Sequence, residues 1–275
     1  MILYHDVDGC LNPEDGATLG FRREELSSSS RTSLQALGKA LDASAVDYFV
    51  LNTGRSWATS RYLCEEINST KVRFAFAVHA SQLWNVASGE QIDLLGIAHS
   101  LGSADLTKAL SGIVEMDRLI EWFAMEGALK LANRLGYPGR FTPAFDKTSN
   151  LTFAIPRSID GHTLVGILKD LIAVEPSINS ASFIYHHSAP EGFIDVMPGV
   201  DKSTGVALMR GVVGHNNMQT AAIGNGLNDL PMLEAVDIAI CPNNAEPQVR
   251  AYCSQRGGLS GRNYIGATLD WLGKV

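Results

Sequence analysis

Short apolar runs alternate with segments of helical periodicity near both ends of this chain. Residues 46–51 form one such run, and the segment before it has leucines on one helical face at positions 34, 37 and 41. The same alternation returns over residues 220–240. Strands that alternate with helices pair in parallel and are covered by those helices. The sequence therefore predicts an α/β fold with a doubly wound, Rossmann-like parallel sheet.

The middle of the chain lacks this alternation. The elements expected there are helices and short strands at residues 117–135, 151–155, 163–172 and 183–187. We interpret this region as an insertion with its own small α+β layer. The sequence thus predicts a discontinuous core domain of residues 1–83 and 189–275, and a cap domain of residues 84–188 that forms a separable lid.

Two aspartates follow the first apolar run of the chain. Residues 2–5 are followed by Asp6 and Asp8, one residue apart, and then by Gly9. Residues i and i+2 of a strand point to the same side, and a turn would also bring the two carboxylates together. Two carboxylates held that close favour a bound cation or a shared proton. The pattern is typical of a metal site, an acid–base pair or a nucleophile beside its acid, although Asp and Gly are also turn residues.

Composition argues against several classes of protein. The chain has 275 residues and a net charge of −7, whereas nucleic-acid binders need clustered Lys and Arg. Its apolar runs are all shorter than the roughly 20 residues of a membrane span, and the N-terminal residues do not resemble a secretory signal. The four cysteines form no C-x-x-C pair, as is typical of reduced thiols. We expect a cytoplasmic monomer or homodimer that binds neither nucleic acid nor membranes.

Three apolar runs end in clusters of small and polar residues, at residues 6–9, 52–55 and 224–229. Ligands of open parallel sheets bind outside the carboxyl ends of the strands, so these clusters are expected to face one crevice. The Thr53 hydroxyl and nearby backbone N–H groups can hold an anion, and the third cluster offers oxygens to a hard cation. With Lys202 to offset phosphate charge, this set indicates phosphoryl transfer at an aspartate.

The four segments resemble the motifs of the haloacid dehalogenase superfamily of phosphatases, in its large-cap, Cof-like branch. The motif D-x-D-G-x-L corresponds to residues 6–11, and T-G-R to residues 53–55. The lysine that follows a P-x-G-V turn corresponds to Lys202, and G-D-x-x-N-D-x-x-M-L to residues 224–233. The order and spacing fit, with the cap between the second and third motifs. The resemblance covers both core segments well and the cap only by position.

The resemblance implies that Asp6 attacks phosphorus to form an aspartyl-phosphate, while Asp8 protonates the leaving oxygen and then activates water. The groups that it implies for phosphate binding are Thr53, the backbone N–H of Gly54, Lys202 and Asn228. The implied ligands of Mg²⁺ are Asp6, the backbone carbonyl of Asp8, Asn225 and Asp229. Position 225 departs from the motif, because asparagine replaces the usual aspartate. A neutral amide oxygen should bind Mg²⁺ more weakly than a carboxylate does.

The expected function is therefore a Mg²⁺-dependent phosphomonoester hydrolase that acts on a small phosphorylated metabolite, with sugar phosphates as the expected substrate class. A phosphomutase of the same fold is the first alternative, since it would use the same aspartyl-phosphate. A non-catalytic phosphate-binding or phospho-accepting module is the second alternative, because an aspartate pair, a threonine and a lysine would serve it too. A large cap and an acid at Asp8 favour the enzyme.

Overall fold

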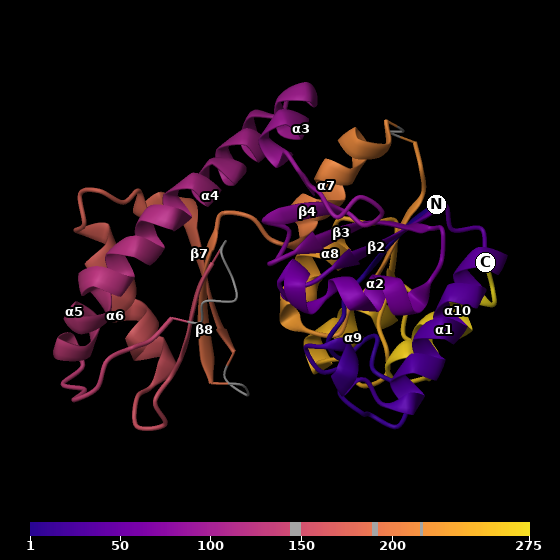
Figure 1. The fold of residues 1–275 in the computed structure, drawn as a ribbon, viewed down its shortest axis with the longest axis horizontal. Coiled ribbons are helices and arrows are strands. Elements are labelled where there is room, and N and C mark those ends of the chain that lie inside the picture. The colour runs from indigo at the N-terminus through magenta and orange to yellow at the C-terminus, as the bar shows by residue number, and fades with distance from the viewer. Residues whose placement is uncertain (144–149, 189–191, 215–216) are drawn as a thin grey trace. The chain divides into compact units, whose positions relative to one another are not determined.

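The computed structural model describes residues 1–143, 150–188, 192–214 and 217–275 (Figure 1). Contacts divide the chain into two compact units. The first contains Met1–Leu101 and Asp201–Val275, and the second contains Gly102–Val200. The first unit is therefore assembled from the two ends of the chain, with the second unit inserted between them in sequence.

A seven-stranded sheet forms the centre of the first unit, in the order β10-β9-β1-β2-β3-β4-β5. Its strands are β1 (Ile2–His5), β2 (Tyr48–Asn52), β3 (Val72–Ala77), β4 (Gln82–Asn85), β5 (Gln91–Ile92), β9 (Thr220–Ile223) and β10 (Ile238–Ile240). The strands from β10 to β3 run parallel, whereas β4 and β5 pair antiparallel. This sheet confirms the predicted α/β class.

Helices surround the sheet of the first unit. They are α1 (Ser28–Ala43), α2 (Arg61–Ile67), α3 (Leu94–Ser100), α7 (Lys202–Val213), α8 (Leu230–Glu234), α9 (Pro247–Ser254) and α10 (Ile265–Leu272), with 3₁₀ turns at Arg23–Glu25, Trp57–Thr59 and Leu227–Asp229. Helix α1 begins after Ser27 because the Ser27 side chain accepts a hydrogen bond from the Ser30 N–H at 3.0 Å. Helices α1 and α10 contact each other, as do α7 and α8.

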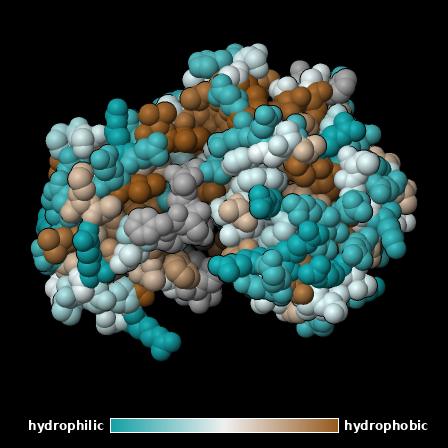
Figure 2. Space-filling model, viewed as in Figure 1, coloured by the Kyte–Doolittle hydropathy of each residue, from teal (hydrophilic) through white to brown (hydrophobic). Residues whose placement is uncertain are grey.

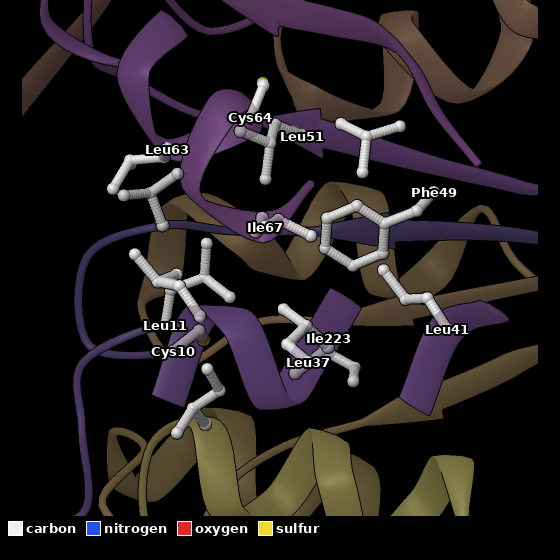
Figure 3. Packing of buried hydrophobic residues seen from close by; sticks show 14 of the residues in the cluster. Cys10, Leu11, Leu37, Leu41, Phe49, Leu51, Leu63, Cys64, Ile67 and Ile223 are labelled. Carbon is white, nitrogen blue, oxygen red and sulfur yellow. The ribbon is translucent and has the colours of Figure 1, made fainter. Parts of the chain in front are cut away.

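The two faces of the sheet have separate packing partners. On one face, Phe49 and Leu51 of β2 pack with the leucines of α1 in a continuous apolar cluster (Figure 3). Cys10, which follows the D-x-D-G segment, packs in the same cluster. On the other face, the Tyr4 hydroxyl donates to the carbonyl of Val206 in α7 at 3.4 Å. Burial on both faces explains why these parallel strands are apolar throughout.

The second unit has a three-stranded antiparallel sheet in the order β6-β8-β7. Its elements are β6 (Leu151–Ala154), β7 (Phe183–Ser188), β8 (Phe193–Pro198), α4 (Ala104–Trp122), a π-helix at Phe123–Gly127, α5 (Ala128–Arg134), α6 (Gly161–Ala173) and a 3₁₀ turn at Ser180–Ser182. One face of the sheet packs on the helices, where Phe123 and Phe153 stack with ring centroids 5.1 Å apart. This unit has the α+β character expected of the middle of the chain.

The borders of the units differ from the predicted boundaries near residues 84 and 188. Strand β4 pairs antiparallel with β3, so residues 82–85 extend the central sheet, and α3 contacts α7 within the first unit. Strand β8 lies within the segment 189–275 that was assigned to the core domain, but it pairs with β6 and β7 of the second unit. A short apolar run shows that a strand forms but not which sheet it joins, and this explains both differences.

None of the helices that the structure describes is both long and apolar enough to cross a membrane. The visible surface of the first unit is mainly hydrophilic (Figure 2). All four cysteines are buried and free.

Candidate active site

Lys202 lies between two carboxylates inside the first unit. It is the first residue of α7 and is fully buried, and its Nζ donates to Oδ1 of Asp6 and to Oδ1 of Asp229, at 2.5 Å each. Asp201 caps α7, with its side chain accepting from the Ser203 N–H at 2.8 Å. This cap fixes the point at which the helix begins and so fixes the lysine against the end of β1.

The buried charges in this cluster shift the pKa of two groups. Burial, together with the negative charge of Asp229, raises the pKa of Asp6 to about 7, although the Lys202 ammonium opposes the shift. Burial alone would lower the pKa of Lys202, but the two carboxylates outweigh it and raise that pKa. The two carboxylates thus favour the charged form of Lys202, which lies between them.

Asp229 organises the loop that follows β9. Its Oδ2 accepts from the backbone N–H groups of Asn225 and Gly226, at 2.8 and 2.9 Å, while its Oδ1 accepts from Lys202. A methyl group on Gly224 would lie 2.4 Å from Cβ of Asp229, so only glycine fits there. Because both oxygens of Asp229 already accept hydrogen bonds, its role as a metal ligand stays a prediction.

The side chain of Asn225 points toward the aspartate pair. As the amide stands, its Oδ1 faces the backbone carbonyl of Asp8 and Oδ2 of Asp6, so three oxygens face one another. After a half-turn of the amide, its nitrogen would instead donate to these two oxygens, at 2.7 and 3.3 Å. One carboxylate, one carbonyl and one amide therefore converge at the predicted metal position. Among the described residues, no three His, Cys, Asp or Glu side chains are grouped closely enough to hold a metal ion by themselves.

The carboxylate of Asp8 is bound by Arg55. Arg55 Nε donates to Oδ2 at 2.9 Å and Nη2 donates to Oδ1 at 2.5 Å, a bidentate pair. The guanidinium is buried, whereas 61% of the Asp8 side chain is exposed. Arg55 also donates to the carbonyl of Gly20 and lies 4.8 Å from the ring centroid of Phe21. The sequence analysis placed Arg55 in a motif but missed this role, because the pair joins residues 47 positions apart in the chain.

Thr53 and Gly54 lie in a loop that is locked to the turn after β3. The Thr53 carbonyl accepts from the His79 N–H at 3.0 Å, and its hydroxyl accepts from the Arg55 N–H at 3.1 Å. A methyl group on Gly54 would lie 2.6 Å from Cε1 of His79, so a larger residue there would displace the imidazole. Asn228, the remaining predicted phosphate ligand, is half-buried, and its side chain makes no hydrogen bond to the described residues.

Three consecutive residues of that turn have left-handed backbone conformations. They are Val78, His79 and Ala80, with φ angles of 49°, 54° and 68°. Left-handed conformations are costly for residues other than glycine, and most of all for a β-branched one. Such strain persists where the surrounding structure enforces it, and here the Val78 N–H donates to the carbonyl of Arg55 at 2.9 Å. Sequence analysis missed this turn because the segment contains no glycine or asparagine to indicate it.

The chain is similar to known proteins both in part of its sequence and in its fold. Residues 168–257 match the family of haloacid dehalogenase-like hydrolases, while no curated protein matches. This chain is similar to the structure of the sucrose-phosphatase from Synechocystis sp. PCC6803 in complex with sucrose and phosphate. The two share 17% sequence identity with a TM-score of 0.64, and the match covers 100% of this chain and 97% of that one. A haloacid dehalogenase-like hydrolase from Bacteroides thetaiotaomicron is similar with 15% identity and a TM-score of 0.58, covering 99% and 98%.

A third similar structure is from Plasmodium vivax, from a protein assigned to the HAD/COF-like hydrolases, with 16% identity, a TM-score of 0.60 and coverage of 99% and 94%. At these identities the structures share the fold with this chain, an α/β core with an inserted cap. The match over residues 168–257 and the shared fold both agree with the resemblance to haloacid dehalogenase-like hydrolases that the sequence indicated.

Proposed function

We propose that this protein is a Mg²⁺-dependent phosphatase that hydrolyses phosphomonoesters of small metabolites through Asp6. The observation that carries the proposal is the buried contact of Lys202 with Asp6 and Asp229. A dianionic phosphate approaches a carboxylate only where positive charge offsets the repulsion. Lys202 supplies that charge directly beside the proposed nucleophile.

The residues around Asp6 fit a Mg²⁺ site. Oδ2 of Asp6, the carbonyl of Asp8 and the amide of Asn225 converge, and hard oxygen donors of this kind suit Mg²⁺, which also keeps several waters. When bound, Mg²⁺ would reduce the negative charge between the phosphate and Asp6. Asp229 would support these groups indirectly, because it fixes the loop that carries Asn225 and pairs with Lys202.

In the proposed reaction, Asp6 attacks phosphorus and the ester oxygen leaves with a proton from Asp8. Water then attacks the aspartyl-phosphate, gives a proton to Asp8 and releases phosphate. Thr53 and the Gly54 N–H would hold the phosphoryl oxygens. The exposed carboxylate of Asp8 is accessible to a leaving group, while the pair with Arg55 limits the directions in which it can point.

We propose sugar phosphates as the substrate class, with the second unit as the source of selectivity. Support comes from the similarity in fold to a sucrose-phosphatase structure that contains sucrose and phosphate. The test is a screen for phosphate release over a panel of phosphorylated metabolites, with Mg²⁺ and with EDTA. Release that depends on Mg²⁺ supports the proposal, whereas phosphate binding without release favours a non-catalytic module. Transfer of the phosphoryl group within the substrate would indicate a mutase.

Two substitutions test the chemistry. Asp6→Asn should abolish turnover, because the amide cannot attack phosphorus, and activity within tenfold of the wild type would contradict the mechanism. Asp8→Asn should impair esters with poor leaving groups more than activated esters in the first half-reaction, since a good leaving group needs less protonation. An equal loss on both kinds of ester, in pre-steady-state measurements of that half-reaction, would contradict the acid role.

A further inference from the structure

His5, the last residue of β1, is a fully buried histidine directly before Asp6. Its Nδ1 lies 2.5 Å from the backbone oxygen of Asp6, and its Nε2 lies 2.6 Å from Oγ1 of Thr268 in α10. The ring also packs against Phe49, with centroids 5.4 Å apart. Burying an imidazole is costly unless both nitrogens have partners, so these two hydrogen bonds define how the ring is held.

The two partners of the His5 ring determine which ring nitrogen carries a proton. A backbone carbonyl can only accept, so Nδ1 of His5 donates to the Asp6 oxygen whatever the charge of the ring. In the neutral ring Nε2 then accepts from the Thr268 hydroxyl. Thr268 is itself fully buried in the first turns of α10. A hydrogen-bonded chain therefore runs from α10 through His5 to the peptide that joins Asp6 to Val7.

This series of hydrogen bonds determines the direction in which the Asp6–Val7 peptide faces. The side chains of consecutive strand residues point to opposite faces, so His5 lies on the α10 face and the Asp6 carboxylate lies on the Lys202 face. No peptide bond within the described part of the chain is cis, and the C=O and N–H of a trans peptide point in opposite directions. With the Asp6 carbonyl held by His5, the Val7 N–H is directed toward the face of the Asp6 carboxylate.

The Val7 N–H is also available to a ligand. Val7 is buried, and its N–H donates no hydrogen bond to the residues that the structure describes. Buried backbone donors are almost always paired, so an unpaired donor beside the proposed nucleophile needs a partner. An oxygen of the phosphoryl group attacked by Asp6 has the right charge and the right place.

We propose that His5 and Thr268 are positioning residues, which hold the Asp6 carbonyl and thereby orient the Val7 N–H toward the transferring phosphoryl group. The inference rests on the proposed phosphatase function. His5 acts through the Asp6–Val7 peptide and does not touch the substrate. Its contribution should appear mainly in kcat, because the donor is aimed at charge that develops during transfer.

A matched pair of substitutions separates the two hydrogen bonds of His5. His5→Asn places an amide N–H near the position of Nδ1 and keeps the donor to Asp6, whereas His5→Gln reaches the position of Nε2 and keeps only the contact with Thr268. With p-nitrophenyl phosphate, His5→Gln should lose about tenfold to a hundredfold in kcat, with a similar rise in the inhibition constant of vanadate. His5→Asn should stay within about threefold of the wild type. Equal losses in both variants, or losses that follow the melting temperature, would overturn the proposal.

Wild-type protein provides a test that requires neither a variant of His5 nor catalysis. In ¹⁵N-valine-labelled protein, inorganic phosphate with Mg²⁺ should shift the Val7 amide resonance, which is assigned by its absence in Val7→Ile. Thr268→Val should reduce this shift and Thr268→Ser should restore it. A Val7 resonance that does not respond to bound phosphate, detected by its ³¹P signal, would refute the positioning role. Absence of hydrolysis with a normal Val7 response would refute only the phosphatase function.

Discussion

Replacing Asp6 by asparagine should stabilise the metal-free protein at neutral pH, even though it should abolish activity. Without a metal, ionised Asp6 and Asp229 share one ammonium group, so the buried cluster has an excess negative charge. Burial and the charge of Asp229 raise the pKa of Asp6 from 3.8 to about 7. The folded protein therefore binds the Asp6 proton more tightly than the unfolded chain does. When Asp6 ionises, this contribution to the unfolding free energy is lost.

The size and sign of the effect follow from these pKa values. The contribution of Asp6 to stability is fully present below pH 3.8 and is lost as the pH rises through about 7. The difference between the two pKa values corresponds to roughly 4 kcal/mol. Asparagine does not titrate, so the unfolding free energy of Asp6→Asn minus that of the wild type should increase from pH 4.5 to pH 8.

Urea unfolding followed by circular dichroism, in EDTA at a series of pH values, measures this difference. Asp8→Asn is the control, because it removes a carboxylate from the same loop but leaves the contact of Asp6 with Lys202 in place. Mg²⁺ should increase the unfolding free energy of the wild type but not that of Asp6→Asn. A difference that stays flat or decreases toward pH 8 would refute the account of the buried charges.

Asn225→Asp should lower the Mg²⁺ concentration required for half-maximal activity, because a carboxylate replaces a neutral amide among the proposed ligands. Titrations of activity against Mg²⁺ and calorimetric titrations of Mg²⁺ binding measure this change. An unchanged or higher requirement would mean that position 225 is not a ligand. Gly54→Ala should lower activity by at least about tenfold, since its methyl group would meet the neighbouring imidazole at 2.6 Å, whereas Gly261→Ala has open space and should leave kcat/KM unchanged. Arg55→Lys should not preserve activity, because lysine cannot reproduce the bidentate pair with Asp8; a lysine variant with wild-type kcat would contradict a role for that pair.

The sequence predicted those parts of the site that depend on where strands end. Asp6 and Asp229 follow β1 and β9, neighbouring parallel strands whose carboxyl ends share one edge of the sheet. Lys202 contacts both carboxylates from the first turn of α7. What could not be predicted depends on long-range pairing or on strained backbone. The sheet joined by β8 is one example, and the left-handed turn at Val78 is another, since enforced strain has no residue signature when glycine is absent.

The position of β1 has a consequence for how the protein is made. β1 pairs with β2, where Ile2 is opposite Tyr48, and with β9, where Ile2 is opposite Thr220. During synthesis, β1 and β2 emerge long before β9, so one edge of β1 stays unpaired while the whole second unit is translated. An apolar strand with an open edge is a template for pairing with other chains. Closing so long a loop is also slow, so the nascent chain should depend on chaperones until residues 220–223 have been added.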